Sequence, residues 1–200
     1  MYLDFDAEKH RYTLTDGITD EALPSVTQIL SAEGFIISHN NNSDWHMEKG
    51  RFVHSMIELH LKGVLDEDTL DPFLRPSLEA FRQFQGATGF SVQGFETPLY
   101  YPHQYYMYAG TPDMWGTLNG VQTLVDVKSG GPAKWHVLQL AAYHELLRIN
   151  GHEIKQAANL YLSNDGKYSL SKPLSARELR IFFQVFLCAV TTYKWKKENL

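Results

Sequence analysis

The strongest constraint on the fold comes from a predicted β-hairpin over residues 110–130. Asn119-Gly120 lies at its centre, and this pair favours a type I′ turn because both positions accept positive φ angles. The flanking residues are largely apolar or β-branched, which is typical of strands. A two-residue turn pairs Leu118 with Val121, and the same register places Asp113 directly opposite Asp126.

Charged residues are unexpected in an otherwise apolar hairpin. Opposed Cβ atoms lie about 5 Å apart, so the carboxylates of Asp113 and Asp126 would repel each other by about 3 kcal/mol at an effective dielectric constant of about 20. A bound cation between them would remove this repulsion. Lys128 lies two residues beyond Asp126 and therefore shares its face. Because Pro112 cannot donate to a ladder, a bulge or strand end there could shift this register by one residue.

The whole chain sets further limits on fold and function. Its 200 residues, 44% of them hydrophobic, suffice for a single domain with a buried core. We expect no membrane span, because no apolar run approaches about 20 residues, and no signal peptide. Cys188 is the single cysteine, which excludes an internal disulfide and a cysteine-ligated zinc or iron–sulfur site and favours the cytoplasm. The net charge of −5 argues against a general nucleic-acid-coating protein but permits an enzyme that meets phosphates through metal ions.

Residue periodicity predicts alternating helices and strands around the hairpin. We expect two strands near the N-terminus, a helix capped by Ser25, helices over residues 44–62 and 72–88, a strand over 92–101, a helix over 132–149, strands over 156–163 and 167–172, and a helix from Ser175 to about residue 196. This order predicts an α/β protein. Its central mixed sheet would have about five strands flanked by helices, with Val125 and Val127 facing a core.

Four short motifs occur in order between residue 50 and about residue 165. They are Gly50-x-x-x-His54, Gly110-x-x-Asp113, Asp126-x-Lys128 and Gln139-x-x-x-Tyr143. Together they resemble the PD-(D/E)XK nuclease superfamily, and most closely its RecB-like and phage exonuclease branch. The resemblance implies one nuclease domain over residues 1–200, with a hairpin and helix extension over 1–49 and a restriction-endonuclease-like core over 50–200.

The resemblance also implies a role for each motif residue. Asp113, Asp126 and the backbone carbonyl of Val127 would hold Mg²⁺ or Mn²⁺, which prefer hard oxygen ligands. Such an ion activates water and screens the phosphate. Lys128 would orient the water or stabilise the developing charge. His54 matches the RecB-type histidine that touches a metal, with a surface ion pair to Glu58 as the alternative.

Two helix residues and one strand residue complete the predicted site. Gln139 and Tyr143 share one helical face, where they would position water, Lys128 or a phosphate, or simply pack. Glu96, on the strand beside the hairpin, would be an added ligand or an outer partner, or else an ordinary strand-face charge.

The predicted function is a metal-dependent DNA nuclease that hydrolyses phosphodiester bonds. By resemblance we expect an exonuclease in phage-type recombination or DNA processing. An endonuclease on the same core, an inactive DNA-binding module and an unrelated metal-binding α/β protein remain alternatives. The intact pair of aspartates and the lysine favour catalysis. DNA is the expected partner, while a homo-oligomer or a recombination partner protein is left open.

Overall fold

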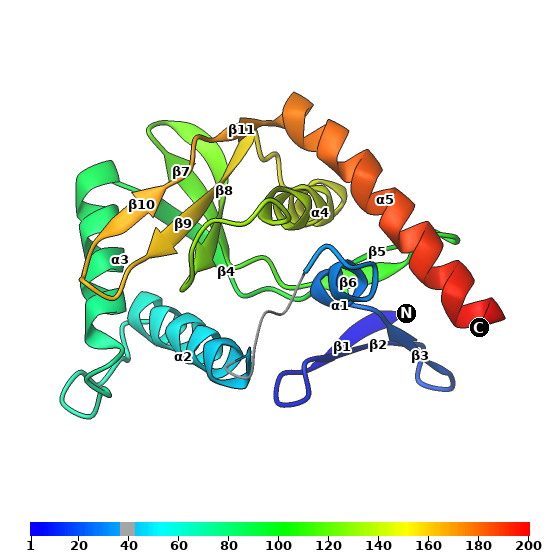
Figure 1. The fold of residues 1–200 in the computed structure, drawn as a ribbon, viewed down its shortest axis with the longest axis horizontal. Helices are drawn as coiled ribbons and strands as arrows, with labels where there is room; N and C mark the ends of the chain where they lie inside the picture. The colour runs from blue at the N-terminus through cyan, green and yellow to red at the C-terminus, as the bar shows by residue number, and fades with distance from the viewer. Residues whose placement is uncertain (37–42) are drawn as a thin grey trace.

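The computed structural model describes residues 1–36 and 43–200. A mixed sheet lies between two layers of helices, with α2 and α3 on one face and α4 and α5 on the other (Figure 1). The elements in chain order are β1 (Tyr2–Asp6), β2 (Arg11–Thr15), β3 (Asp20–Leu23), α1 (Val26–Ala32), α2 (Ser43–Leu61), α3 (Arg75–Thr88), β4 (Ser91–Phe95), β5 (Leu99–Tyr101), β6 (Tyr108–Gly110), β7 (Met114–Leu118), β8 (Val121–Lys128), α4 (His136–Ile149), β9 (Gln156–Leu162), β10 (Tyr168–Leu170), β11 (Leu174–Ser175) and α5 (Ala176–Asn199).

The predicted α/β class, a mixed sheet between helices with an N-terminal hairpin, is confirmed. The main sheet has six strands rather than about five, in the order β10-β9-β8-β7-β4, with β11 also paired to β9. Within the main sheet of the described residues, only β8 and β9 run parallel, and the chain between them passes through α4. This crossover places α4 over the carboxyl end of β8, where charged residues gather.

The central hairpin has the predicted register. Leu118 pairs with Val121 and Met114 with Val125. Asn119 and Gly120 adopt φ angles of 50° and 80°, as a type I′ turn requires. Val125 is fully buried against α2 and α3, while its neighbour Leu124 faces α4 and α5. Because side chains alternate along β8, this one strand contributes to the cores on both faces of the sheet.

Both predicted serine caps are confirmed. Ser25 Oγ accepts a hydrogen bond from the Gln28 N–H, and Ser175 Oγ accepts one from the Glu178 N–H. The side chains of Gln28 and Glu178 accept from the cap N–H groups in return, so both helices begin with a capping box. The start of each helix was readable because these bonds join residues only three apart.

Several predicted boundaries are wrong. The helices expected from Pro72 and Pro132 begin at Arg75 and His136, because the chain first makes a turn after each proline. The strand expected over residues 92–101 splits into β4, in the main sheet, and β5, which pairs with β6. β3 and β11 were not predicted.

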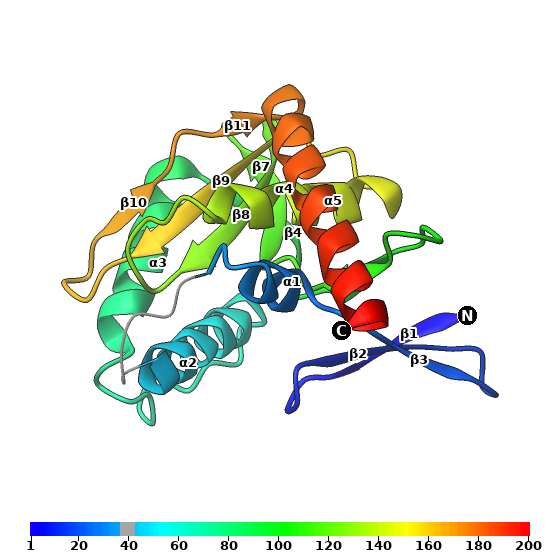
Figure 2. The same cartoon turned by 45° about the vertical axis from the view of Figure 1, so that its right-hand side comes forward.

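The N-terminal region forms a separate three-stranded antiparallel sheet in the order β1-β2-β3. It lies at the end of the molecule away from β10 (Figure 2). Tyr12, Leu14 and Leu23 pack from this sheet against Ala109 of β6. Among the described residues, no helix is long and apolar enough to cross a bilayer.

Candidate metal centre

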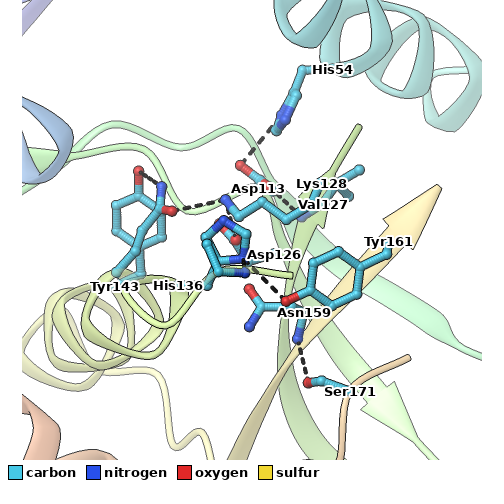
Figure 3. Close-up of polar contacts among 12 residues, drawn as sticks. His54, Asp113, Asp126, Val127, Lys128, His136, Tyr143, Asn159, Tyr161 and Ser171 are labelled. Carbon is cyan, nitrogen blue, oxygen red and sulfur yellow. Dashed lines mark hydrogen bonds and ion pairs between the residues drawn. The ribbon is translucent and has the colours of Figure 1, made fainter. Parts of the chain in front are cut away.

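Charged side chains meet at the ends of three neighbouring strands of the main sheet. Glu96 directly follows β4, Asp113 directly precedes β7, and Lys128 ends β8. Because β7 runs antiparallel to both neighbours, these three points lie side by side. His54 reaches these strand ends from α2 (Figure 3), and Gln139 reaches Lys128 from α4, so the centre lies between the two helical layers.

Three side chains form a compact cluster. His54 Nδ1 lies 3.2 Å from Glu96 Oε1 and 3.4 Å from Asp113 Oδ1. One ligand atom from each residue lies within 4.8 Å of the other two. A cavity of about 10 Å³ adjoins the cluster, which is about the space that one water molecule needs. The cluster can therefore hold a metal ion.

The sequence predicted Glu96 on a strand, but the structure places it outside the strands. It sits in the break after β4 with a φ angle of 41°, which a non-glycine residue rarely adopts. Its N–H donates to the Asp113 carbonyl at 2.9 Å. This bond continues the β4–β7 register by one residue and holds Glu96 beside Asp113, and the positive φ angle of Glu96 marks the point where β4 ends.

Asp113 is anchored outside the ladder. The sequence predicted that Asp113 would pair with Asp126 across the two strands. The β7–β8 ladder instead ends one residue earlier, at the pair of Met114 with Val125. Asp113 Oδ2 accepts a hydrogen bond from the Val127 N–H at 2.5 Å. The next ladder bond would need an N–H from Pro112, which has none. The Val127 carbonyl therefore receives no ladder donor from Pro112, which fits its predicted role as a metal ligand.

Asp126 lies beside the cluster but not within it. It is fully buried, and Oδ2 lies 2.5 Å from Lys128 Nζ. Neither carboxylate oxygen accepts a hydrogen bond of good geometry from the part of the chain that the structure describes. Burial raises the pKa of Asp126 to about 6, although the Lys128 charge opposes this rise. The Lys128 ammonium offsets part of the cost of burying this carboxylate, but Oδ1 has no donor among the described residues.

The residues present fit a divalent cation. The two carboxylates of the cluster, the Asp126 carboxylate and the Val127 carbonyl are hard donors, which suit Mg²⁺ and Mn²⁺. The His54 imidazole is a borderline donor that Mn²⁺ accepts more readily than Mg²⁺. The roles of these residues as ligands stay predictions, whereas their proximity is observed.

Protonated His54 balances the negative charges of Glu96 and Asp113. Burial disfavours its protonated form, but the carboxylates of Asp113 and Glu96 outweigh burial and raise the pKa of His54 to about 9. Burial likewise raises the pKa of Asp113, and the His54 charge opposes that rise. The alternative surface pair with Glu58 is not formed, because Glu58 binds Lys62 at 2.6 Å.

A chain of hydrogen bonds connects Lys128 to α4. Lys128 Nζ donates to Gln139 Oε1 at 2.8 Å, and Gln139 Nε2 donates to the Tyr143 hydroxyl at 3.1 Å. Burial raises the pKa of Tyr143 well above its usual value, so the hydroxyl keeps its proton. The last two motifs of the sequence are thus in direct contact, although their catalytic role stays a prediction.

The glycine of the second motif makes room for the tyrosine of the fourth. A Cβ atom on Gly110 would lie 2.7 Å from Tyr143 Cε1. Gly50, in the first motif, shows no such need, because a Cβ there would lie at an ordinary 3.6 Å from Ser129 Oγ. Gly110 is therefore required by the tyrosine ring rather than by backbone conformation.

Two neighbours of the centre were not predicted from the sequence. Asn159 pairs with Asp126 in the parallel β8–β9 ladder, is 3% exposed, and its Oδ1 has no partner among the described residues. The Trp135 ring lies under Lys128 Nζ, 5.7 Å from its centroid. No local pattern marks either residue, because the β8–β9 register depends on a crossover of 27 residues between Lys128 and Gln156.

Comparisons with known proteins give the following. No protein-family model matches the chain, and a comparison with curated proteins finds no match. Among solved structures, a protein from Eubacterium rectale described as a "Putative exonuclease" aligns with a TM-score of 0.47 and 11% identity, over 82% of this chain and 73% of its own. The protein SSO0001 aligns with a TM-score of 0.34 and 15% identity, over 82% and 83%.

Proposed function

We propose that this protein is a divalent-metal-dependent deoxyribonuclease. One observation carries the proposal: the His54, Glu96 and Asp113 cluster lies beside a fully buried Asp126, which is paired with Lys128 through Oδ2 and whose Oδ1 has no hydrogen-bond partner among the described residues. Among the described residues, only Lys128 and His54 are paired with these three carboxylates, so the centre carries more acidic groups than nearby cations. The order of the four sequence motifs, which resembles PD-(D/E)XK nucleases, supports the same function.

Each residue near the centre has a definite task in this proposal. A divalent ion held by the cluster and Asp126 would lower the pKa of a bound water and screen the phosphate charge. Lys128 supplies hydrogen-bond donors where negative charge develops on the phosphate. Gln139 fixes the Lys128 ammonium by accepting one of its hydrogen bonds, and Tyr143 holds the Gln139 amide in turn.

A cleavage assay tests this function. Linear duplex, closed circular and single-stranded DNA are incubated with Mg²⁺, Mn²⁺ or EDTA. We expect cleavage with either metal and none with EDTA. Asp113→Asn should abolish cleavage, whereas Asp165→Asn, at an exposed surface pair with Lys167, should leave it intact. Cleavage that survives in Asp113→Asn would contradict the proposed site.

We further propose an exonuclease acting in phage-type recombination or DNA processing, on the grounds of the RecB-like motif order. Digestion of linear DNA with intact circles supports this choice. Nicking of circles would favour an endonuclease, and binding without cleavage would favour an inactive DNA-binding module.

A further inference from the structure

A buried hydrogen bond connects the N-terminal sheet to the metal centre. The Tyr12 hydroxyl, on β2, lies 2.8 Å from Thr111 Oγ1, just two residues before Asp113. Tyr12 is 1% exposed and Thr111 is 8% exposed, so water does not compete for this contact. The bond joins a region outside all four sequence motifs to the segment that presents a metal ligand.

The segment between β6 and β7 has few other polar anchors. It lies outside both ladders, and Pro112 brings no N–H group to it. Asp113 itself is held by Glu96 and Val127, through the backbone and the carboxylate respectively. The Tyr12 hydroxyl therefore fixes the near end of a segment whose far end carries the carboxylate of the cluster.

The N-terminal sheet is firmly attached at this point. The Ala109 N–H donates to the Pro24 carbonyl at 3.0 Å, and Ser25 forms a parallel bridge with Ala109. The Tyr12 ring stacks on Phe5 with centroids 4.5 Å apart. A hydroxyl on such a fixed ring can define the position of its partner.

We propose that Tyr12 is a positioning residue for Asp113, acting through Thr111, and that the N-terminal sheet is thereby a working part of the metal centre. The effect of Tyr12 on cleavage rests on the proposed nuclease function. The positional claim is independent of cleavage, because the Val127 amide reports directly on Asp113.

Hydrogen exchange in metal-free protein tests the positional claim. Tyr12→Phe removes one oxygen and keeps the ring. We expect the Val127 amide, which donates to Asp113 Oδ2, to exchange up to about tenfold faster relative to the Val125 amide in the same strand, as loss of one hydrogen bond allows. Tyr108→Phe is the matched control, since Tyr108 is equally buried and its hydroxyl donates to the Ala142 carbonyl at 3.1 Å.

A second set of variants tests the path through Thr111. Thr111→Val should reproduce the effect of Tyr12→Phe, the double variant should add little to either, and Thr111→Ser should restore wild-type exchange. The Mn²⁺ concentration for half-maximal cleavage should rise severalfold in the first two variants, with a smaller change at saturating Mn²⁺.

An unchanged ratio of Val127 to Val125 exchange in Tyr12→Phe would overturn the proposal, as would an equal change in Tyr108→Phe. Absence of metal-dependent cleavage in the wild-type protein would instead refute the nuclease function, and the exchange result would still decide whether Tyr12 positions Asp113.

Discussion

Replacement of Gly110 by alanine tests whether two separate motifs form one unit. The new Cβ would lie 2.7 Å from Tyr143 Cε1 and 3.2 Å from both Leu146 Cδ1 and Val26 Cγ2. The tyrosine ring must therefore retreat by about 0.7 Å to reach the 3.4 Å at which ordinary contact begins. The ring is 7% exposed and Leu146 and Val26 are fully buried, so no free space receives it.

Two losses follow from this displacement. Overpacking of a closed core costs about 1–3 kcal/mol of unfolding free energy. The Tyr143 hydroxyl also holds Gln139, which holds Lys128, so movement of the ring reaches the ammonium group. A misplacement approaching 1 Å at a catalytic group can lower the rate by about 10²-fold. We therefore expect Gly110→Ala to lose both stability and cleavage.

Denaturant unfolding and cleavage at saturating Mn²⁺ measure the two losses. Gly86→Ala is the control with the opposite sign, because this helical glycine has open space and an alanine there should stabilise by about 0.5–1 kcal/mol without changing cleavage. In a Tyr143→Leu background, the stability cost of Gly110→Ala should shrink markedly. Full stability and full cleavage in Gly110→Ala, or an undiminished cost in that background, would refute the reasoning.

Three further variants test individual contacts of the centre. Lys128→Ala should lower the cleavage rate by at least about 10²-fold while calorimetry still detects Mn²⁺ binding; lost binding with surviving cleavage would reverse the assigned roles. The pKa of His54 is raised from 6.5 to about 9, so in EDTA its contribution to stability is present below about pH 6.5 and lost as pH rises through 9. His54→Ala should therefore flatten the decline in unfolding free energy over that range, and an unchanged decline would contradict the charge balance. Asn159→Leu should weaken Mn²⁺ binding through Asp126, whereas Gln156→Leu, in the same ladder but paired with Thr123, should not.

The parts of the fold that local chemistry decides were predictable. The Asn119-Gly120 turn fixes the hairpin register by itself, and Ser25 and Ser175 mark their helix starts through bonds three residues away. The break at Glu96 was not predictable in this way. Strand-forming residues continue on both sides of it, and the partners of Glu96, namely His54 and Asp113, lie outside the local sequence.

The residues of the candidate site likewise separate into those that the sequence predicts and those that it does not. Asp113 was named from the hairpin register, whereas His54 was named because resemblance to known motifs supplies long-range information that spacing alone lacks. Asn159 and Tyr12 belong to no motif, and their contacts depend on how β9 and the N-terminal sheet dock. Residues that support a site from a distance therefore emerge only when the strands are placed in space.

The residues of the centre lie far apart in the sequence. This separation determines when the centre can form during folding. The Tyr12 and Thr111 contact joins residues 99 apart, and the His54 and Glu96 contact joins residues 42 apart. The β7–β8 hairpin needs only a two-residue turn, and closing short loops precedes closing long ones during folding. Metal binding should consequently be among the last properties to return when the denatured chain refolds. In rising denaturant it should be lost before the main sheet unfolds.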